Sequence, residues 1–125
     1  MKFNLINSIY KIDIKTKIGI TLLAIKPNHV VDIFNEHFNN ITKKSVLISI
    51  VAGKTTATLK KLSNNNKNIA RAMTNTPVTV GWGTSVAYFT KTTTKTNKIK
   101  VLSLLDLVGQ VDEVKSEKYI NSFTG

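Results

Sequence analysis

The chain has 125 residues, 42% of them hydrophobic, a length that gives one domain with a modest core and excludes a two-domain enzyme. It has no cysteine, which excludes a disulfide scaffold, a thiolate zinc site, an iron–sulfur cluster and a thiol nucleophile. The formal charge is +11, but Arg71 is the only arginine among its 18 cations. Because base and phosphate recognition favours the planar guanidinium, this charge predicts a solvated lysine-rich surface and makes nucleic-acid binding a minor alternative.

The sequence contains no run near the ~18 apolar residues that span a bilayer. At the start of the chain, Asn4, Asn7 and Asp13 interrupt the apolar residues, so no signal-type core is predicted. We therefore expect a cytoplasmic protein with no membrane contact. His29 and His37 have no carboxylate partner at ligand spacing, and no metal site is expected.

Apolar runs alternate with helix-like segments along the first half of the chain. Residues 18–25 form a near-continuous apolar run that predicts a strand buried on both faces. Residues 30–38 follow with apolar side chains at helical spacing, and Asn28 is expected to cap this helix. A second buried strand is predicted over 45–52 and a second helix over 55–62.

The second half continues the alternation with shorter elements. A third strand is predicted over 69–73. The side chains of residues 84–89 alternate in character as those of a strand do, which predicts a fourth strand. Apolar residues between 102 and 108 predict a helix that Gly109 ends, followed by a small last strand over 111–114. The order of strands and helices, with short connections, predicts an α/β fold of three layers with a short, mainly parallel sheet.

Residues 91–100 are basic and low in complexity, and they favour a solvated loop that runs into a lysine-faced helix over a phosphate-binding patch. Two glycine motifs are incomplete. The sequence Gly-Lys-Thr at 53–55 lacks the earlier glycine of a phosphate-binding loop, and Gly-Trp-Gly at 81–83 lacks the third glycine of the dinucleotide fingerprint. Neither motif predicts a nucleotide site by itself.

Ligands of an open parallel sheet are expected outside the carboxyl ends of its strands. These ends lie at residues 24–27, 50–53 and 73–77, where small residues combine with glycine or proline and let a flat ligand approach the main chain. Asn75 and Thr76 add an amide and a hydroxyl. No carboxylate pair or nucleophile triad stands out, so no catalytic residue is predicted.

Three segments at these strand ends carry specific motifs. The sequence reads Leu-Ala-Ile-Lys-Pro at 23–27, Ser-Ile-Val-Ala-Gly-Lys-Thr at 49–55 and Arg-Ala-Met-Thr-Asn-Thr-Pro at 71–77. In these motifs and their spacing the chain resembles the pyrroline-5-carboxylate reductase family. The resemblance divides the chain into a poorly matched N-terminal segment, residues 1–17, and a partial NAD(P)-binding Rossmann-like domain, residues 18–125.

The resemblance implies a cofactor, NADP or NAD, that is held by the three strand ends. The implied contacts are Ala24, Ile25, Lys26, Pro27, Ile50, Val51, Ala52 and Asn75. It also implies the NAD(P)H-dependent reduction of the imine 1-pyrroline-5-carboxylate to L-proline, in which the cofactor supplies the hydride. Two residues depart from the family: Val51 stands where alanine is usual and would add bulk near the cofactor, and Trp82 stands where a charged residue is common.

The resemblance also implies that parts of the family's machinery are missing. The chain has no glycine-rich turn for the pyrophosphate, and it ends before the Ser-Gly-Ser-Gly-Pro motif and the dimerisation domain that supply the substrate site and the oligomer. We therefore expect a truncated reductase that is inactive on its own. Two alternatives stay open: a chain that pairs with a separately encoded remainder of the reductase, and a non-enzymatic basic module that binds nucleic acid or a partner protein.

Overall fold

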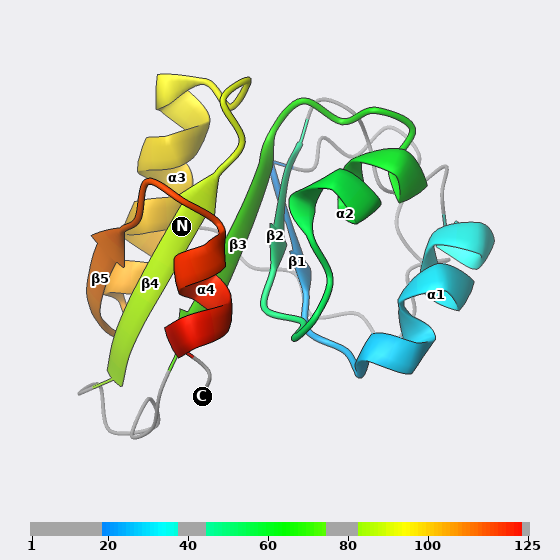
Figure 1. Ribbon diagram of the computed structural model, residues 1–125. Coiled ribbons are helices and arrows are strands. Elements are labelled where there is room, and N and C mark those ends of the chain that lie inside the picture. Colours follow the sequence, from blue (N-terminus) through cyan, green and yellow to red (C-terminus); the bar gives the residue numbers. More distant parts are fainter. Residues whose placement is uncertain (1–18, 38–44, 75–82, 124–125) are drawn as a thin grey trace.

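A computed structural model of the chain describes residues 19–37, 45–74 and 83–123. In these residues, five strands form one sheet in the order β1-β2-β3-β4-β5 (Figure 1). The strands are β1 (Ile20–Leu23), β2 (Val46–Ser49), β3 (Ile69–Thr74), β4 (Gly83–Phe89) and β5 (Gly109–Glu113). The helices are the 3₁₀ turn η2 (Pro27–His29), α1 (Val30–His37), α2 (Thr56–Leu62), α3 (Lys95–Asp106) and α4 (Lys118–Phe123). The predicted α/β class is confirmed.

The sheet is mainly parallel, as predicted. β1, β2 and β3 run parallel, β4 is antiparallel to β3, and β5 is parallel to β4. A helix separates each parallel pair along the chain, as a parallel crossover requires. Only residues 75–82 join β3 to β4, and so short a connection suits an antiparallel pair.

Different helices cover the two faces of the sheet (Figure 1). α1 and α2 pack on one face, where Phe34, Leu47 and Leu59 are at most 2% exposed. α4 lies on the same side, against β3 and β4. α3 covers the opposite face, in a cluster that includes the fully buried Ile48 and Val101. These helices and the sheet make the three predicted layers.

β1 is shorter and more open than the strand predicted over 18–25. The prediction of burial on both faces is wrong, because Leu22 is 52% exposed while Leu23, on the other face, is buried. Among the described strands β1 stands at the edge of the sheet, and α3 packs on β2, β4 and β5 instead. All four residues of β2, by contrast, are buried as predicted. An apolar run specifies a strand but not the neighbour that covers it.

α1 begins at Val30 as predicted, but its expected cap is wrong, and α3 begins earlier than the helix predicted from residue 102. Asn28 does not cap α1, because Pro27 opens the 3₁₀ turn and Asn28 lies within it. α3 begins at Lys95, inside the segment 91–100 that was predicted as a loop running into a lysine-faced helix. Its cap is Thr94, whose Oγ1 accepts a hydrogen bond from the N–H of Asn97 at 3.2 Å. This cap stabilises the first turn of a helix whose amino-terminal half has little apolar character.

Gly109 begins β5 and does not end the preceding helix, which stops at Asp106. The last strand therefore starts two residues before the predicted 111–114. α4 follows β5 and was not predicted. Only Ile120 among residues 118–122 is buried, and one buried apolar residue leaves no helical pattern in the sequence. No helix in the described part of the chain is long and apolar enough to cross a bilayer.

Candidate functional site

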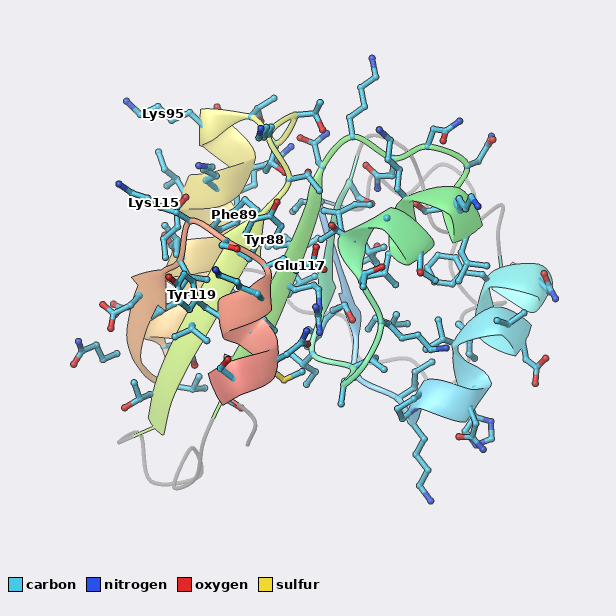
Figure 2. All side chains as sticks on the ribbon, viewed as in Figure 1. Tyr88, Phe89, Lys95, Lys115, Glu117 and Tyr119 are labelled. Carbon is cyan, nitrogen blue, oxygen red and sulfur yellow. The ribbon has the colours of Figure 1, made fainter. Side chains whose placement is uncertain are left out.

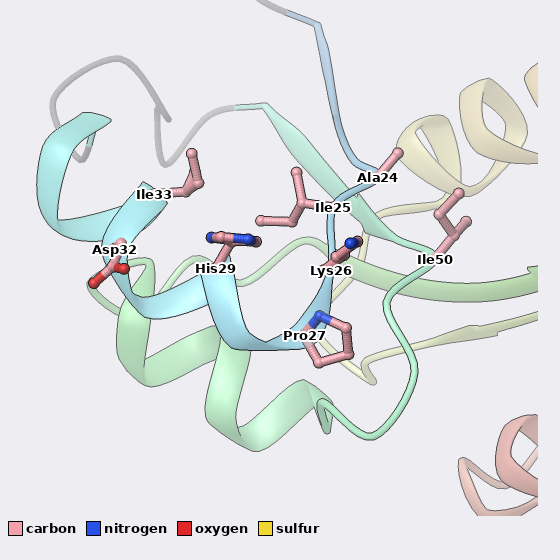
Figure 3. Close-up of a pocket in the computed structure, with 8 residues that line it drawn as sticks. All are labelled: Ala24, Ile25, Lys26, Pro27, His29, Asp32, Ile33 and Ile50. Carbon is pink, nitrogen blue, oxygen red and sulfur yellow. The ribbon is translucent and has the colours of Figure 1, made fainter.

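An open pocket lies at the carboxyl end of β1, where the chain passes into η2 and α1 (Figure 3). Its volume is about 900 Å³. The lining consists of Ala24, Ile25, Lys26, Pro27, His29, Asp32, Ile33 and Ile50. Because ligands of parallel α/β sheets bind at this edge, the pocket is the candidate functional site.

The turn that shapes the pocket follows from the pair Lys26-Pro27. Lys26 is extended, with φ −67° and ψ 145°, the conformation that a following proline favours. Pro27 occupies the start of η2, and the N–H of His29 donates to the carbonyl of Lys26 at 3.0 Å. The chain then continues into α1, which Val30 and Phe34 anchor in the core. The strand end and the first helical turn thus form a continuous wall.

The pocket combines an apolar wall with polar side chains. Its three isoleucines are partly buried and pack against the two core clusters. Lys26, His29 and Asp32 are exposed and supply a cation, an imidazole and a carboxylate. Such a lining suits a ligand with a flat apolar ring and polar or anionic substituents. The described residues contain no cluster of His, Asp and Glu that could hold a metal ion.

The second strand end divides between pocket and core. Ile50 lines the pocket, and its N–H donates to the carbonyl of Leu23 at 3.1 Å, which holds the two strand ends together. Val51 is 2% exposed and packs with α1 and α2, so its bulk fills the core and not the pocket. Ala52 is exposed but is not part of the pocket lining.

The third strand end is only partly described. Asn75 lies outside the described residues, as do Thr76 and Trp82. The structure therefore brings together five of the eight predicted cofactor contacts. They are Ala24, Ile25, Lys26, Pro27 and Ile50. Their role in holding a cofactor stays a prediction.

Sequence reasoning missed three residues of the lining, His29, Asp32 and Ile33. The sequence did carry a signal for them. They follow Lys26 at intervals of three to four residues, which places them on one side of a helical segment directly after the first strand end.

An ion pair between the buried Arg71 and the partly buried Glu117 joins β3, α2 and α4 beside the second strand end. Arg71 on β3 is 1% exposed, and its Nη1 donates to Glu117 Oε1 at 3.0 Å. Glu117 also accepts hydrogen bonds from the backbone N–H and the Oγ1 of Thr56, at 2.7 and 2.8 Å. Arg71 Nη2 donates to Asn121 Oδ1 at 3.2 Å. No spacing rule predicts this pair, because 46 positions separate its two residues.

The sequence is similar to curated reductases. No family model matches the sequence. A curated relative, the pyrroline-5-carboxylate reductase of Kluyveromyces lactis, is 32% identical over 105 residues, which cover 84% of this chain and 35% of the relative. The chain spans 35–40% of the length of the curated relatives it matches.

The solved structures that match the fold include two reductases. The pyrroline-5-carboxylate reductase of Coxiella burnetii has a TM-score of 0.76 at 30% identity, over 84% of this chain and 39% of that protein. The pyrroline carboxylate reductase of Plasmodium falciparum, solved with NADP bound, has a TM-score of 0.70 at 26% identity, over 78% of this chain and 38% of that protein. These matches confirm the predicted Rossmann-like fold.

Proposed function

The chain is a homologue of part of the pyrroline-5-carboxylate reductases, and we propose that its pocket at the end of β1 is part of a binding site for NADP or NAD. One observation carries the proposal. Five residues that the family resemblance implies as cofactor contacts, from Ala24 to Pro27 together with Ile50, line this pocket. The relative from Plasmodium falciparum was solved with NADP bound, in support of the same cofactor class.

The residues of the pocket fit a nicotinamide dinucleotide. The small, exposed side chain of Ala24 leaves the main chain open to a flat ring, and Ile25 and Ile50 offer apolar contact that excludes water from it. Lys26 supplies a positive charge for a phosphate group. Such a cofactor, when bound, supplies the hydride that reduces an imine carbon. The described residues bind and orient the ligand.

We propose further that the chain does not reduce 1-pyrroline-5-carboxylate to L-proline by itself. Its six glycines form no G-x-G-x-x-G turn, the arrangement whose N–H groups hold a pyrophosphate at a helix N-terminus. Without these donors we expect weak, millimolar dinucleotide binding, and hydride transfer requires reactants held within about 3.5 Å of each other. A separately encoded remainder of the reductase is the partner that would complete the site.

The alternative of a non-enzymatic basic module has no support from the relatives. The three proteins compared above are all reductases by name. The lysine-rich surface is therefore best explained as a solvated surface.

The test of cofactor binding is a titration of the 125-residue chain with NADPH, followed by amide chemical shifts and by the fluorescence of Trp82, the only tryptophan. We expect shifts at residues 24–33 and at Ile50. Ala24→Glu places a carboxylate in the pocket and is expected to weaken binding at least about fivefold through repulsion of the phosphates. Ala57→Glu, at an exposed site on α2, is the matched control and should bind as the wild type does.

Two outcomes would contradict the binding proposal: no response to millimolar NADPH, or an equal loss in the two variants. The second part of the proposal is tested by NADPH oxidation in the presence of 1-pyrroline-5-carboxylate. We expect no oxidation by the chain alone and measurable oxidation after addition of a polypeptide that carries the remainder of a relative. Turnover by the chain alone would overturn this part.

A further inference from the structure

Glu117, which lies directly before α4 (labelled in Figure 2), makes polar contacts with two elements that are far apart in the sequence, α2 and β3. We infer that it is a positioning residue, which fixes the loop at 50–55 between β2 and α2 and thereby the wall that Ile50 gives to the pocket. This inference rests on the proposed function in so far as that wall contacts a dinucleotide. The placement of the loop by Glu117 can be measured without any ligand.

The carboxylate of Glu117 holds the amino end of α2. Thr55 caps this helix by accepting from the N–H of Thr58 at 3.2 Å, which leaves the N–H of Thr56 without a partner inside the helix. Glu117 Oε1 accepts that N–H at 2.7 Å, and Oε2 accepts the Thr56 hydroxyl at 2.8 Å. Hydrogen bonds to a carboxylate are about twice as strong as bonds between neutral groups. The start of α2 is therefore tied to the segment that leads into α4.

The loop between Ile50 and Thr56 is fixed at both ends. At its start, the N–H of Ile50 donates to the carbonyl of Leu23 at 3.1 Å, and the N–H of Val51 donates to Ser49 Oγ at 3.2 Å. In its middle, Gly53 has a φ of +74°, and a Cβ atom built on it would have no neighbour within 4 Å. The loop thus has little packing of its own at this point, and the bonds from Glu117 restrain its far end.

Arg71 keeps the Glu117 carboxylate in place and depends on it. The guanidinium is 1% exposed, and its Nε has no hydrogen-bond partner in the described structure. Glu117 is the acid that pairs with it there, at 3.0 Å. A buried cation without this partner is strongly disfavoured, so the carboxylate cannot swing out to solvent without a large penalty. Arg71 also opens the third motif, so one carboxylate connects that motif with Thr56, the residue directly after the second motif.

The experiment compares backbone amide hydrogen exchange in the wild type, Glu117→Gln and Glu117→Ala, without ligand. Glutamine retains an oxygen for the Thr56 N–H but loses the charge, whereas alanine removes every contact. We expect exchange at the amides of 53–56 to rise at least about tenfold in Glu117→Ala and less in Glu117→Gln, beyond any uniform rise over the chain. Glu113→Gln, at an exposed carboxylate paired with Lys98, is the control and should leave these amides unchanged.

The same variants are then titrated with NADPH. We expect Glu117→Ala to weaken binding about three- to tenfold, with partial recovery in Glu117→Gln, because the loop must be ordered before Ile50 can contact the ligand. If the wild type binds no NADPH, the proposed function fails while the exchange result still stands. The inference itself is overturned if exchange at 53–56 is unchanged, or rises only as much as in the rest of the chain. If Glu117→Ala does not fold, Glu117→Gln decides by the same criterion.

Discussion

Gly109 lies directly opposite Gly83 in the ladder between β4 and β5, so close that a Cβ built on Gly109 would be 1.8 Å from the carbonyl oxygen of Gly83. The φ of Gly109 is +145°, which residues with a side chain rarely adopt. The contact and the backbone conformation both require glycine at this position. They set how closely the first residues of β5 approach β4.

Gly109→Ala is therefore expected to lower the free energy of unfolding by at least about 2 kcal/mol, because the strand must move away or the backbone must change. Urea denaturation followed by circular dichroism measures this loss. Gly19→Ala is the control, since nothing lies within 4 Å of its Cβ position, and we expect a change within about 0.5 kcal/mol. An equally small change in Gly109→Ala would show that the two strands are not held at this spacing.

The example of Gly109 shows which parts of the fold the sequence could predict. Strong local patterns identified the first three strands and the helices between them, because buried strands leave apolar runs and helices with one buried side leave apolar residues at helical spacing. A glycine after an apolar helical pattern resembles a helix end, and only its approach to Gly83, a contact distant in sequence, gives it another role. α3 shows the same limit. Its first half is Lys-rich, and the Thr94 cap was a weaker signal than the leucines that follow.

The candidate site was predictable to a similar extent. The residues from Ala24 to Pro27 and Ile50 could be chosen because strand ends of a parallel sheet meet at one edge. Val51 could not be assigned to the core from its motif, since the sequence does not state which way a side chain turns after a strand ends. Glu117 could not be found at all, because its partners lie 46 and 61 positions away.

Arg71→Met tests the energy of the ion pair between the buried Arg71 and the partly buried Glu117. The variant leaves Glu117 with its two bonds to Thr56 but without the guanidinium, and we expect a loss of about 3 kcal/mol in the free energy of unfolding. In a double-mutant cycle with Glu117→Gln, the loss of unfolding free energy in the double variant should be smaller than the sum of the two single losses by at least about 1 kcal/mol. Additive losses in chemical denaturation would show that the two side chains do not stabilise each other.

The exposed pair between Lys98 and Glu113 should behave differently. Its Nζ–Oε1 distance is 2.8 Å, yet the two side chains are 35% and 41% exposed. Water and salt screen such a pair, so Glu113→Gln is expected to change the free energy of unfolding by no more than about 0.5 kcal/mol. The difference in unfolding free energy between Glu113→Gln and the wild type should become smaller still as the salt concentration is raised. A loss as large as that of Arg71→Met would mean that exposure does not decide the strength of these pairs.

Thr94→Ala removes the cap of α3 and is expected to lower the free energy of unfolding by about 1 kcal/mol, because the N–H of Asn97 loses its acceptor. Thr94→Ser keeps an oxygen at the same place and should restore most of that stability. Thr96→Ala, at an exposed site in the first turn of the same helix, is the matched control and should be neutral or slightly stabilising. Thermal and urea denaturation both report the result, and equal effects at the two threonines would rule out the cap.

Leu22→Lys tests the open edge of the sheet. β1 is the edge strand of the described sheet, its four residues carry no charge, and Leu22 is 52% exposed. An apolar edge strand of this kind pairs with other chains, so we expect the wild type to self-associate as its concentration rises. A lysine at the edge opposes that pairing and should reduce association in sedimentation velocity, with little change in stability. Val31→Lys, on an exposed site of α1 with 47% exposure, should leave association unchanged. If both variants associate as the wild type does, the edge of β1 is not the surface through which the chain self-associates.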